Sequence, residues 1–246
     1  MKEYLLEEFA ALPDPYRVSG VITRSEKIYP LGSDTKVLST IFELISRPVV
    51  YRVADRLKLN VVEPIVQNHY PDFTLLKSDT DPAKIAVDVK TTYRDLPGGR
   101  FSYTLGGYTS FIRPGHERKN IVFPFSDYHE HWVIGFVYER AVTKKSAAEH
   151  VFSLSDLAQI PLPFKNVEIF VQEKWRIASD RAGSGNTTNI GSIDGVLEDF
   201  KRGSGPFRDE AEFLSYWRGY GRTSADRKNS YSNIDQFRKR QNRDLR

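Results

Sequence analysis

The 246-residue sequence contains no cysteine, which excludes disulfide scaffolds, thiolate zinc sites and cysteine nucleophiles. No apolar run is long enough to span a membrane. Residues 1–12 alternate acids with Leu and Phe and therefore lack the pattern of a signal peptide. We expect a cytoplasmic protein that has no membrane partner.

Histidine is also scarce, at five residues, and only His129 and His131 lie close together in the chain. No acidic cluster accompanies this pair, so it is assigned to a loop or strand start beside Trp132 rather than to a metal site. The sequence has no internal repeat and no evident domain boundary. With 39% hydrophobic and 28% charged residues, it is typical of a globular protein, and we expect one domain over residues 1–246.

Positive charge is concentrated at the C-terminus. Residues 221–246 hold eight Arg or Lys against three Asp, a surplus that exceeds the net charge of +4 for the whole chain. Such a tail is either a solvated end or an arm that contacts DNA phosphates. Tyr231 and Phe237 within it favour some packing against the core.

The most informative stretch runs from Gln67 to Tyr93. Residues 71–75 and 85–90 have the length and composition of strands, and the turn-forming residues 77–84 between them predict a hairpin. Because side chains alternate along a strand, Asp88 and Lys90 point to the same face. If the strands are antiparallel, Asp72 lies beside Asp88 and completes a pair of carboxylates.

Two carboxylates with a neighbouring lysine suit hydrolysis of a phosphate ester. Carboxylate oxygens bind Mg²⁺, and a lysine that cannot be a ligand while charged stabilises the negative charge that develops on phosphate or water. A surface hairpin with solvated charges would have the same three residues. At this point both interpretations stay open.

Elsewhere the pattern predicts a mixture of helices and strands. A long helix capped by Ser33 or Asp34 continues to about Leu59, with a kink or interruption at Pro48. The further expectations are a helix at 3–11, a hairpin at 18–29, strands at 101–105, 121–125, 132–138 and 167–178, a brief helix after Ser153 or Ser155, and helices at 196–200 and 209–220. Glu43 on the long helix has the pattern of a solvent-facing acid.

Residues 183–192 form a second informative stretch, read as a loop of Gly, Ser, Asn and Thr apart from Ile190. It is not a phosphate-binding P-loop, because no Gly-Lys-Ser/Thr follows. Asn bonds adenine, the Thr methyl packs on thymine, and glycine amides approach guanine acceptors, so the stretch suits the DNA major groove. A plain polar turn is equally compatible with it.

The order Pro71-Asp72, fifteen intervening residues, Asp88-x-Lys90 resembles the signature of the PD-(D/E)xK nuclease superfamily. Longer blocks are similar to one group within it, the type II restriction endonucleases: residues 28–44, 67–75, 104–113 and 182–193. The resemblance covers most of the chain. It is weakest at the N-terminus, in residues 94–101 and 194–204, and in the basic tail.

This resemblance implies an α/β (α+β) fold with a central mixed β-sheet flanked by helices and a small dimerisation hairpin. Residues 18–32 and 150–160 would form the dimer contacts of a bacterial homodimer. The implied metal ligands are Asp72, Asp88 and Glu43, with Lys90 as a further catalytic residue and Glu43 as an auxiliary acid. The implied DNA contacts are Thr35, Lys36, Gln67, Asn68, Thr91, Gly183, Ser184, Gly185, Asn186, Thr187 and Thr188.

The implied activity is Mg²⁺-dependent hydrolysis, with Mn²⁺ as a substitute, of both strands of double-stranded DNA at a short palindrome. The resemblance gives GATATC as the target and blunt ends with 5′-phosphates as the product. A cognate DNA methyltransferase would be the functional companion. Two alternatives are a non-specific or repair nuclease of the same superfamily and a non-catalytic DNA-binding module.

Overall fold

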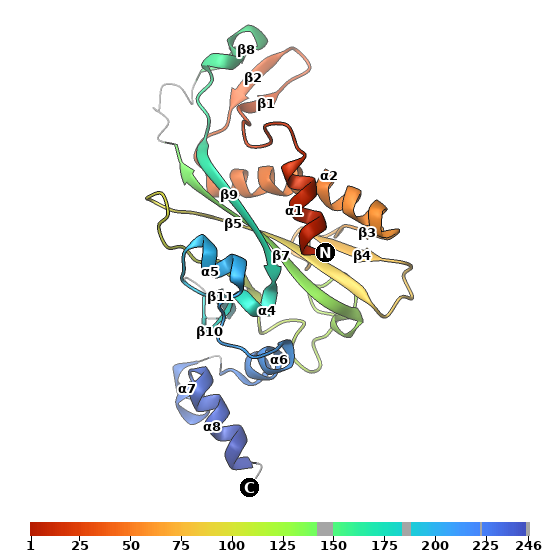
Figure 1. Ribbon diagram of the computed structural model, residues 1–246, viewed down its shortest axis with the longest axis vertical. Coiled ribbons are helices and arrows are strands. Elements are labelled where there is room, and N and C mark those ends of the chain that lie inside the picture. Colours follow the sequence, from red (N-terminus) through yellow and green to blue (C-terminus); the bar gives the residue numbers. More distant parts are fainter. Residues whose placement is uncertain (142–149, 184–187, 222, 245–246) are drawn as a thin grey trace.

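The computed structural model describes residues 1–141, 150–183, 188–221 and 223–244 (Figure 1). The N-terminal half contains α1 (Lys2–Ala10), β1 (Gly20–Ile22), β2 (Lys27–Pro30), α2 (Thr35–Leu57), β3 (Asn60–Val62), β4 (Phe73–Leu76), β5 (Lys84–Tyr93) and β6 (Thr104–Gly107). The C-terminal half contains the 3₁₀ helix η1 (Phe125–Asp127), β7 (Tyr128–Arg140), β8 (Phe152–Ser153), the 3₁₀ helix η2 (Leu154–Gln159), β9 (Phe164–Glu173), α4 (Lys174–Ile177), β10 (Ala178–Ala182), β11 (Asn189–Ser192), α5 (Leu197–Arg202), α6 (Glu210–Gly219), α7 (Ser224–Asn229) and α8 (Ile234–Asp244).

A five-stranded sheet with the order β3-β4-β5-β7-β9 runs through the middle of the molecule. Strands β5 and β7 are parallel, and the other neighbours are antiparallel. The predicted mixed sheet flanked by helices is therefore confirmed. The predicted hairpin of residues 71–90 is its β4–β5 pair.

Two apolar clusters cover the two faces of this sheet. On one face α1 and α2 pack on residues that include Val87 and Val89 of β5. On the other face, Ala86 of β5 joins a cluster with β6, β10, β11 and α6. Because β5 alternates, Asp88 and Lys90 project from the face that bears Ala86, opposite the face that α2 covers.

Helix α2 begins where the sequence predicted. The Asp34 side chain accepts hydrogen bonds from the backbone N–H groups of Lys36 (2.8 Å) and Val37 (3.3 Å). Of the two alternatives predicted at Pro48, a kink or an interruption, the interruption is wrong, because α2 is one helix of 23 residues that contains Pro48. Burial of Val49, Val50 and Val53 after the proline compensates for the hydrogen bond that proline cannot donate.

A small sheet lies apart from the main one, at the upper end in Figure 1, with the order β1-β2-β8. Its first two strands form the predicted hairpin, with Val21 opposite Tyr29. Ile28 of the hairpin pairs with Phe152, so the segments 18–32 and 150–160 meet in space. The brief helix predicted after Ser153 is the 3₁₀ helix η2.

Three local expectations are wrong. Residues 121–125 do not form a strand of the central sheet: Ile121 makes only an isolated bridge to Tyr70, and Phe125 begins η1. Residues 189–192 are a strand rather than part of a loop, because β11 pairs with both β10 and β6. The strand predicted over 167–178 ends at Glu173, where the short helix α4 turns the chain.

The basic C-terminus packs against the core. Tyr231, Ile234 and Phe237 are buried, and the Tyr231 hydroxyl donates to the backbone oxygen of Tyr216 at 2.6 Å. Arg238 forms an ion pair with Glu212 at 2.7 Å. These contacts favour docking over a solvated end for the described part of residues 221–246, and Lys239, Arg240 and Arg243 stay exposed on α8.

Among the described helices, none combines the length with the apolar character that crossing a membrane requires.

Candidate active site

The β4–β5 hairpin brings Asp72, Asp88 and Lys90 together. The register pairs Phe73 with Val87, which sets Asp72, one residue before β4, beside Asp88. The Asp72 Oδ2 atom accepts a hydrogen bond of 2.6 Å from the backbone N–H of Val89, and this contact fixes the carboxylate against β5. The Lys90 Nζ atom lies 2.7 Å from the Asp88 Oδ2 atom. Asp88 is only 4% exposed, so the interpretation as solvated surface charges does not hold.

Burial and mutual repulsion shape the charges of this group. Burial, followed by the negative charge of Asp88, raises the pKa of Asp72 from 3.8 to about 7. Burial alone would lower the pKa of Lys90, but the charges of Asp88 and Asp72 outweigh it and the net shift is upward. The lysine is therefore held as a cation beside the two carboxylates.

These residues fit a divalent cation. The Asp88 Oδ2 atom is buried and, despite its distance to Lys90, receives no hydrogen bond of acceptable angles from the described residues. An unsatisfied carboxylate oxygen beside a second carboxylate is the donor set that Mg²⁺ prefers. A bound cation would also relieve the repulsion that raises the pKa of Asp72.

Glu43 does not join this pair in one cluster. In the part of the chain that the structure describes, no group of three or more His, Asp or Glu side chains is placed to hold a metal. Glu43 lies on α2, which covers the opposite face of β5. It still interacts electrostatically with the site. Burial raises the pKa of Glu43, and the charges of Lys90, which lowers it, and Asp88, which raises it, make smaller contributions.

A cleft of about 630 Å³ opens in front of the acid pair. Gln67 and Asn68 line it, as does Thr188 at the end of the Gly/Asn/Thr segment, so three predicted DNA contacts share one space with the acids. Further lining residues come from the segments 106–111 and 119–120. Gly106 has a φ of +94°, a backbone conformation that favours glycine.

A second cleft of about 480 Å³ shares Lys90 with the first. Thr35 and Thr91 line it, so the structure joins these two predicted contacts to the site through Lys90. Lys36 is exposed at the start of α2 and lines neither cleft.

The predicted base-reading loop rises from β10 and β11. Ser184, Gly185, Asn186 and Thr187 lie outside the described residues. In the stem, the backbone N–H of Gly183 donates to the backbone oxygen of Asn189 at 2.7 Å. At Gly191 an added Cβ would lie 2.9 Å from the Arg181 backbone oxygen, so only glycine lets the two strands approach this closely. The Thr188 oxygen accepts from the backbone N–H of Tyr108 at 3.0 Å and ties the stem to the cleft wall.

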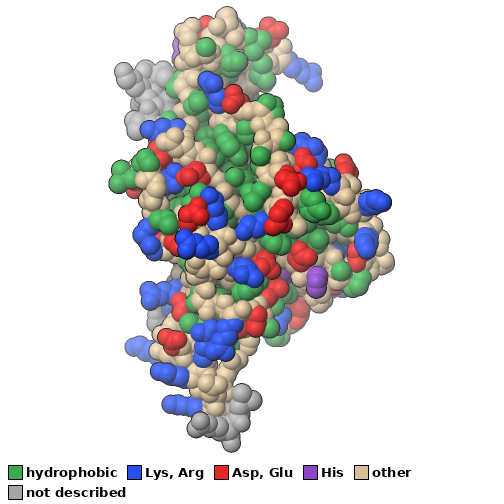
Figure 2. Space-filling view, in the orientation of Figure 1, with side chains coloured by type: hydrophobic (Ala, Val, Ile, Leu, Met, Phe, Trp, Pro, Cys, Tyr) green, Lys and Arg blue, Asp and Glu red, His purple; other side chains and the backbone are tan. Residues whose placement is uncertain are grey.

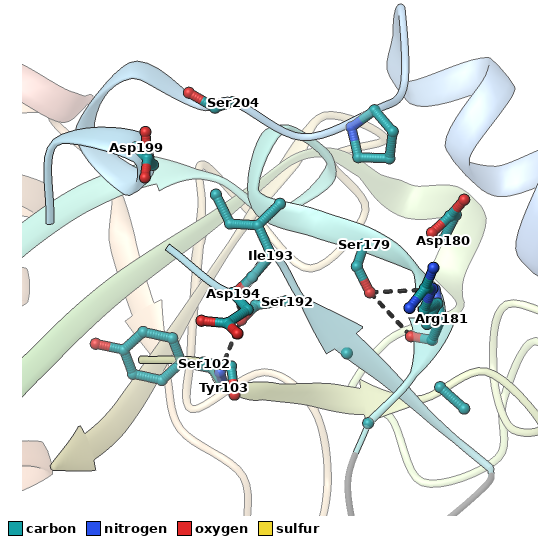
Figure 3. A pocket seen from close by; sticks show the side chains of 14 residues that line it. Ser102, Tyr103, Ser179, Asp180, Arg181, Ser192, Ile193, Asp194, Asp199 and Ser204 are labelled. Carbon is teal, nitrogen blue, oxygen red and sulfur yellow. Dashed lines mark hydrogen bonds between the residues drawn. The ribbon is translucent and has the colours of Figure 1, made fainter. Parts of the chain in front are cut away.

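A separate pocket of about 600 Å³ is lined in part by β10 and β11, the strands of this stem. Figure 3 shows the side chains that surround it. Its hydroxyl groups bond to neighbouring backbone, as when Ser179 Oγ accepts from the N–H of Arg181 and Ser192 Oγ accepts from that of Tyr103. The acid pair and Lys90 do not line it. We therefore assign the candidate active site to the cleft in front of Asp72 and Asp88.

Comparison with known proteins identifies the site's family. Residues 13–242 match the family model described as restriction endonuclease EcoRV. The chain belongs to the EcoRV restriction endonuclease family. Over 223 residues, it is 54% identical to the type II restriction enzyme EcoRV of Escherichia coli, covering 91% of this chain and 90% of that protein. The resemblance that the four sequence blocks carried is thus confirmed.

Sequence reasoning did not single out Lys174, which lies against Tyr70, a residue of the cleft wall. It is 6% exposed, and burial lowers its pKa while the charges of Asp88 and Asp72 raise it. In the sequence it follows Glu173 and looks like any charged residue at a strand end. Only its position in the fold distinguishes it.

Proposed function

We propose that this chain is a type II restriction endonuclease that hydrolyses both strands of double-stranded DNA at GATATC and leaves blunt ends with 5′-phosphates. The observation that carries the proposal is the single cleft shared by Asp72, Asp88, Lys90 and the stem of the Gly/Asn/Thr segment. The residues proposed for hydrolysis and the stem of the segment proposed to read the DNA bases therefore line the same cleft. The family to which the chain belongs supports the same activity.

Asp72 and Asp88 would hold Mg²⁺, or Mn²⁺ in its place. When bound, the cation would supply Lewis-acid stabilisation of the phosphate and of an attacking water. Two observations support this assignment. The Asp88 Oδ2 atom accepts no hydrogen bond from the described residues, and burial together with the charge of Asp88 raises the pKa of Asp72. Glu43 would act as an auxiliary acid through its charge, because α2 holds it outside the carboxylate pair.

Lys90 would stabilise the negative charge that develops on the phosphoryl oxygens during in-line attack by water. Its paired acids keep the ammonium protonated at neutral pH, so it is a donor to phosphate oxygens rather than a metal ligand. The water would lose a proton and form a bond to phosphorus opposite the 3′-oxygen. The bond between phosphorus and the 3′-oxygen would break, that oxygen would take up a proton, and the phosphate would stay on the 5′ side. Lys90 would thus supply a fixed positive charge next to the reacting phosphate.

Residues 183–188 would read the bases in the major groove, with Asn186 bonded to adenine and Thr187 or Thr188 packed on thymine methyls. Gln67 and Asn68 would lie at the minor groove and backbone, and Thr35, Lys36 and Thr91 at phosphates. The central TA step of GATATC kinks easily, so its deformation would add discrimination at poorly contacted pairs.

The enzyme would act as a homodimer, because a palindrome presents the same half-site twice. Support comes from the β1-β2-β8 sheet and η2, where Val21, Ile22, Tyr29, Val151, Leu154 and Leu157 are between 43% and 57% exposed. We call these six residues the hairpin patch. Figure 2 shows hydrophobic side chains at this upper end of the molecule and Lys and Arg side chains at the opposite, C-terminal end.

The remaining features of the proposal follow from the activity. The chain would act as one domain in the bacterial cytoplasm, where its DNA lies. A cognate DNA methyltransferase would protect the host's own copies of the target, without necessarily binding this protein.

The test is incubation of a sequenced plasmid with one GATATC site, in Mg²⁺ and in EDTA, followed by sequencing of the ends. Magnesium-dependent blunt cutting at that site is the expected result. Discrete fragments from another sequence would overturn the assigned target, a smear would indicate a non-specific nuclease, and tight binding without cutting would indicate a binding module. Asn186→Ala should lose discrimination at adenine while keeping affinity for unrelated duplex DNA.

A further inference from the structure

Lys174 is a buried lysine at the first residue of α4, directly after the last residue of β9. Its Nζ atom lies 4.1 Å from the centre of the Tyr70 ring and 6.0 Å from that of Phe111. The other side chains around a small internal gap beside it are apolar apart from His131: Leu105, Ile112, Phe125, Ile190 and Phe213. An ammonium group is expensive to bury in such surroundings, so its retention needs a reason.

No conventional partner supplies that reason. Within the described residues, the Lys174 ammonium forms neither a hydrogen bond nor an ion pair, and its contacts are to aromatic faces. By contrast, the Nζ atom of Lys84, which is also buried, lies 3.4 Å from the Asp127 Oδ2 atom. Because no adjacent anion among the described residues neutralises the Lys174 ammonium, its electric field extends to groups farther away.

Three acidic side chains act on the charge of Lys174: Asp88 and Asp72 of the active site, and Glu210. Burial lowers the pKa of Lys174 to about 8, while Asp88 and Asp72 raise it and Lys90 lowers it. The group is mostly protonated at neutral pH. It thus adds a positive charge whose electrostatic effect reaches the acid pair.

Lys174 also supports the wall of the cleft. Tyr70, on whose ring it sits, is two residues before Asp72 and stacks on Phe111 with 4.7 Å between ring centres. On the other side, the position of a Cβ on Gly106 would be 3.8 Å from the Lys174 Nζ atom. Both Tyr70 and Gly106 line the cleft, so the ammonium lies directly beneath its surface.

We propose that Lys174 is a positioning residue whose buried charge offsets the acid pair, strengthening the hold on a DNA phosphate before metal arrives and weakening the affinity for the metal itself. This inference rests on the proposed function. Two carboxylates repel both a phosphate and each other, and a fixed cation behind them reduces that repulsion. The same cation opposes a divalent metal, so the two effects have opposite signs.

The test compares Lys174→Met, which keeps the length of the side chain and removes the charge, with the wild type. In EDTA, binding to a duplex that contains the target should weaken by about three- to tenfold. Without DNA, calorimetric titration with Mn²⁺ should show metal affinity raised by about three- to tenfold. Lys174→Arg should keep both values near those of the wild type.

Lys165→Met is the matched control. Lys165 is at the other end of β9, about 30 Å away by strand rise, with a side chain 64% exposed, and the substitution makes the same change in net charge. It should move neither quantity by more than about twofold. If Lys174→Met does not fold, Lys174→Gln provides the second neutral variant.

A purely structural lysine would weaken both interactions or neither. Any folded, neutral variant that lacks either of the two opposite shifts overturns the inference. The proposed function is tested separately by the wild type: absence of magnesium-dependent cleavage would sink that function, whereas normal wild-type cleavage with unshifted variants would sink only the role of Lys174.

Discussion

Replacing Asp72 by asparagine is expected to stabilise the metal-free protein and to remove its metal-dependent cleavage. The substitution preserves the shape of the side chain, and the asparagine oxygen can still accept the hydrogen bond from the Val89 N–H group. What it removes is a negative charge that burial and Asp88 oppose. Function and stability are therefore in conflict at this position.

The magnitude follows from the pKa of Asp72, which is raised in the folded protein from 3.8 to about 7. Because the folded state binds the proton more tightly than the unfolded state, stability falls as pH rises between these values. The full cost, present above pH 7, corresponds to about 4 kcal/mol, and at pH 5 only about 1–2 kcal/mol of it applies. The advantage of Asp72→Asn should therefore be greatest at alkaline pH.

Urea unfolding in EDTA, at pH 8 and pH 5, measures this difference directly. Asp81→Asn is the matched control in the same hairpin, because backbone N–H groups of Ala83 and Lys77 lower the pKa of Asp81 and its charge is favourable. Addition of Mg²⁺ should raise the unfolding midpoint of the wild type but not that of Asp72→Asn.

Three results would refute the reasoning: an Asp72→Asn protein no more stable than the wild type at pH 8, an advantage that does not shrink at pH 5, or near-normal cleavage by the folded variant. The first two would mean that the carboxylate is not strained by its neighbours. The third would mean that it does not hold the metal.

Three more predictions follow from other parts of the molecule. Ile22→Asp in the hairpin patch should convert the dimer to a monomer at micromolar concentration, as measured by sedimentation. A variant that stays dimeric would show that this surface is not the dimer interface. Joint replacement of Lys239, Arg240 and Arg243 by Ala should reduce the slope of log affinity against log salt by about 0.9 for each DNA phosphate that these side chains neutralise, whereas an unaltered slope would mean that α8 does not touch DNA. Burial lowers the pKa of His131 to about 3, so the neutral side chain contributes its full stability above pH 6.5, and about 2 kcal/mol of that stability is lost at pH 5. His131→Gln should therefore make the urea midpoint less sensitive to pH between 6.5 and 5. Equal pH sensitivity of the variant and the wild type would contradict the assignment.

The C-terminus shows which features the sequence determines and which depend on tertiary packing. Its charge surplus was evident from the sequence, and Tyr231 and Phe237 indicated docking. The choice between a solvated end and a packed one depended on whether an apolar surface was available to receive those rings. Tyr216 on α6 provides that surface, and its own place in the core comes from residues far away in the chain.

Local rules were sufficient where a short stretch determines its own geometry. The twofold period of a strand placed Asp88 and Lys90 on one face, the Asp34 side chain fixed the start of α2, and turn residues fixed the β4–β5 hairpin that brings in Asp72. The family could likewise be recognised from long blocks of sequence. These features depend on neighbours within a few residues or on inherited sequence.

Tertiary structure decided what depends on distant partners. Pro48 lies within a continuous helix because the apolar face after it packs on the sheet, and residues 189–192 form a strand because β6 and β10 pair with them. The place of Glu43 was likewise decided by the packing of α2 against β5, which leaves it outside any group of three acids among the described residues. Lys174 lies against the ring of Tyr70 because tertiary packing brings the end of β9 there. The charges of Asp88 and Asp72 that act on it come from residues about a hundred positions away in the chain, which no local pattern encodes.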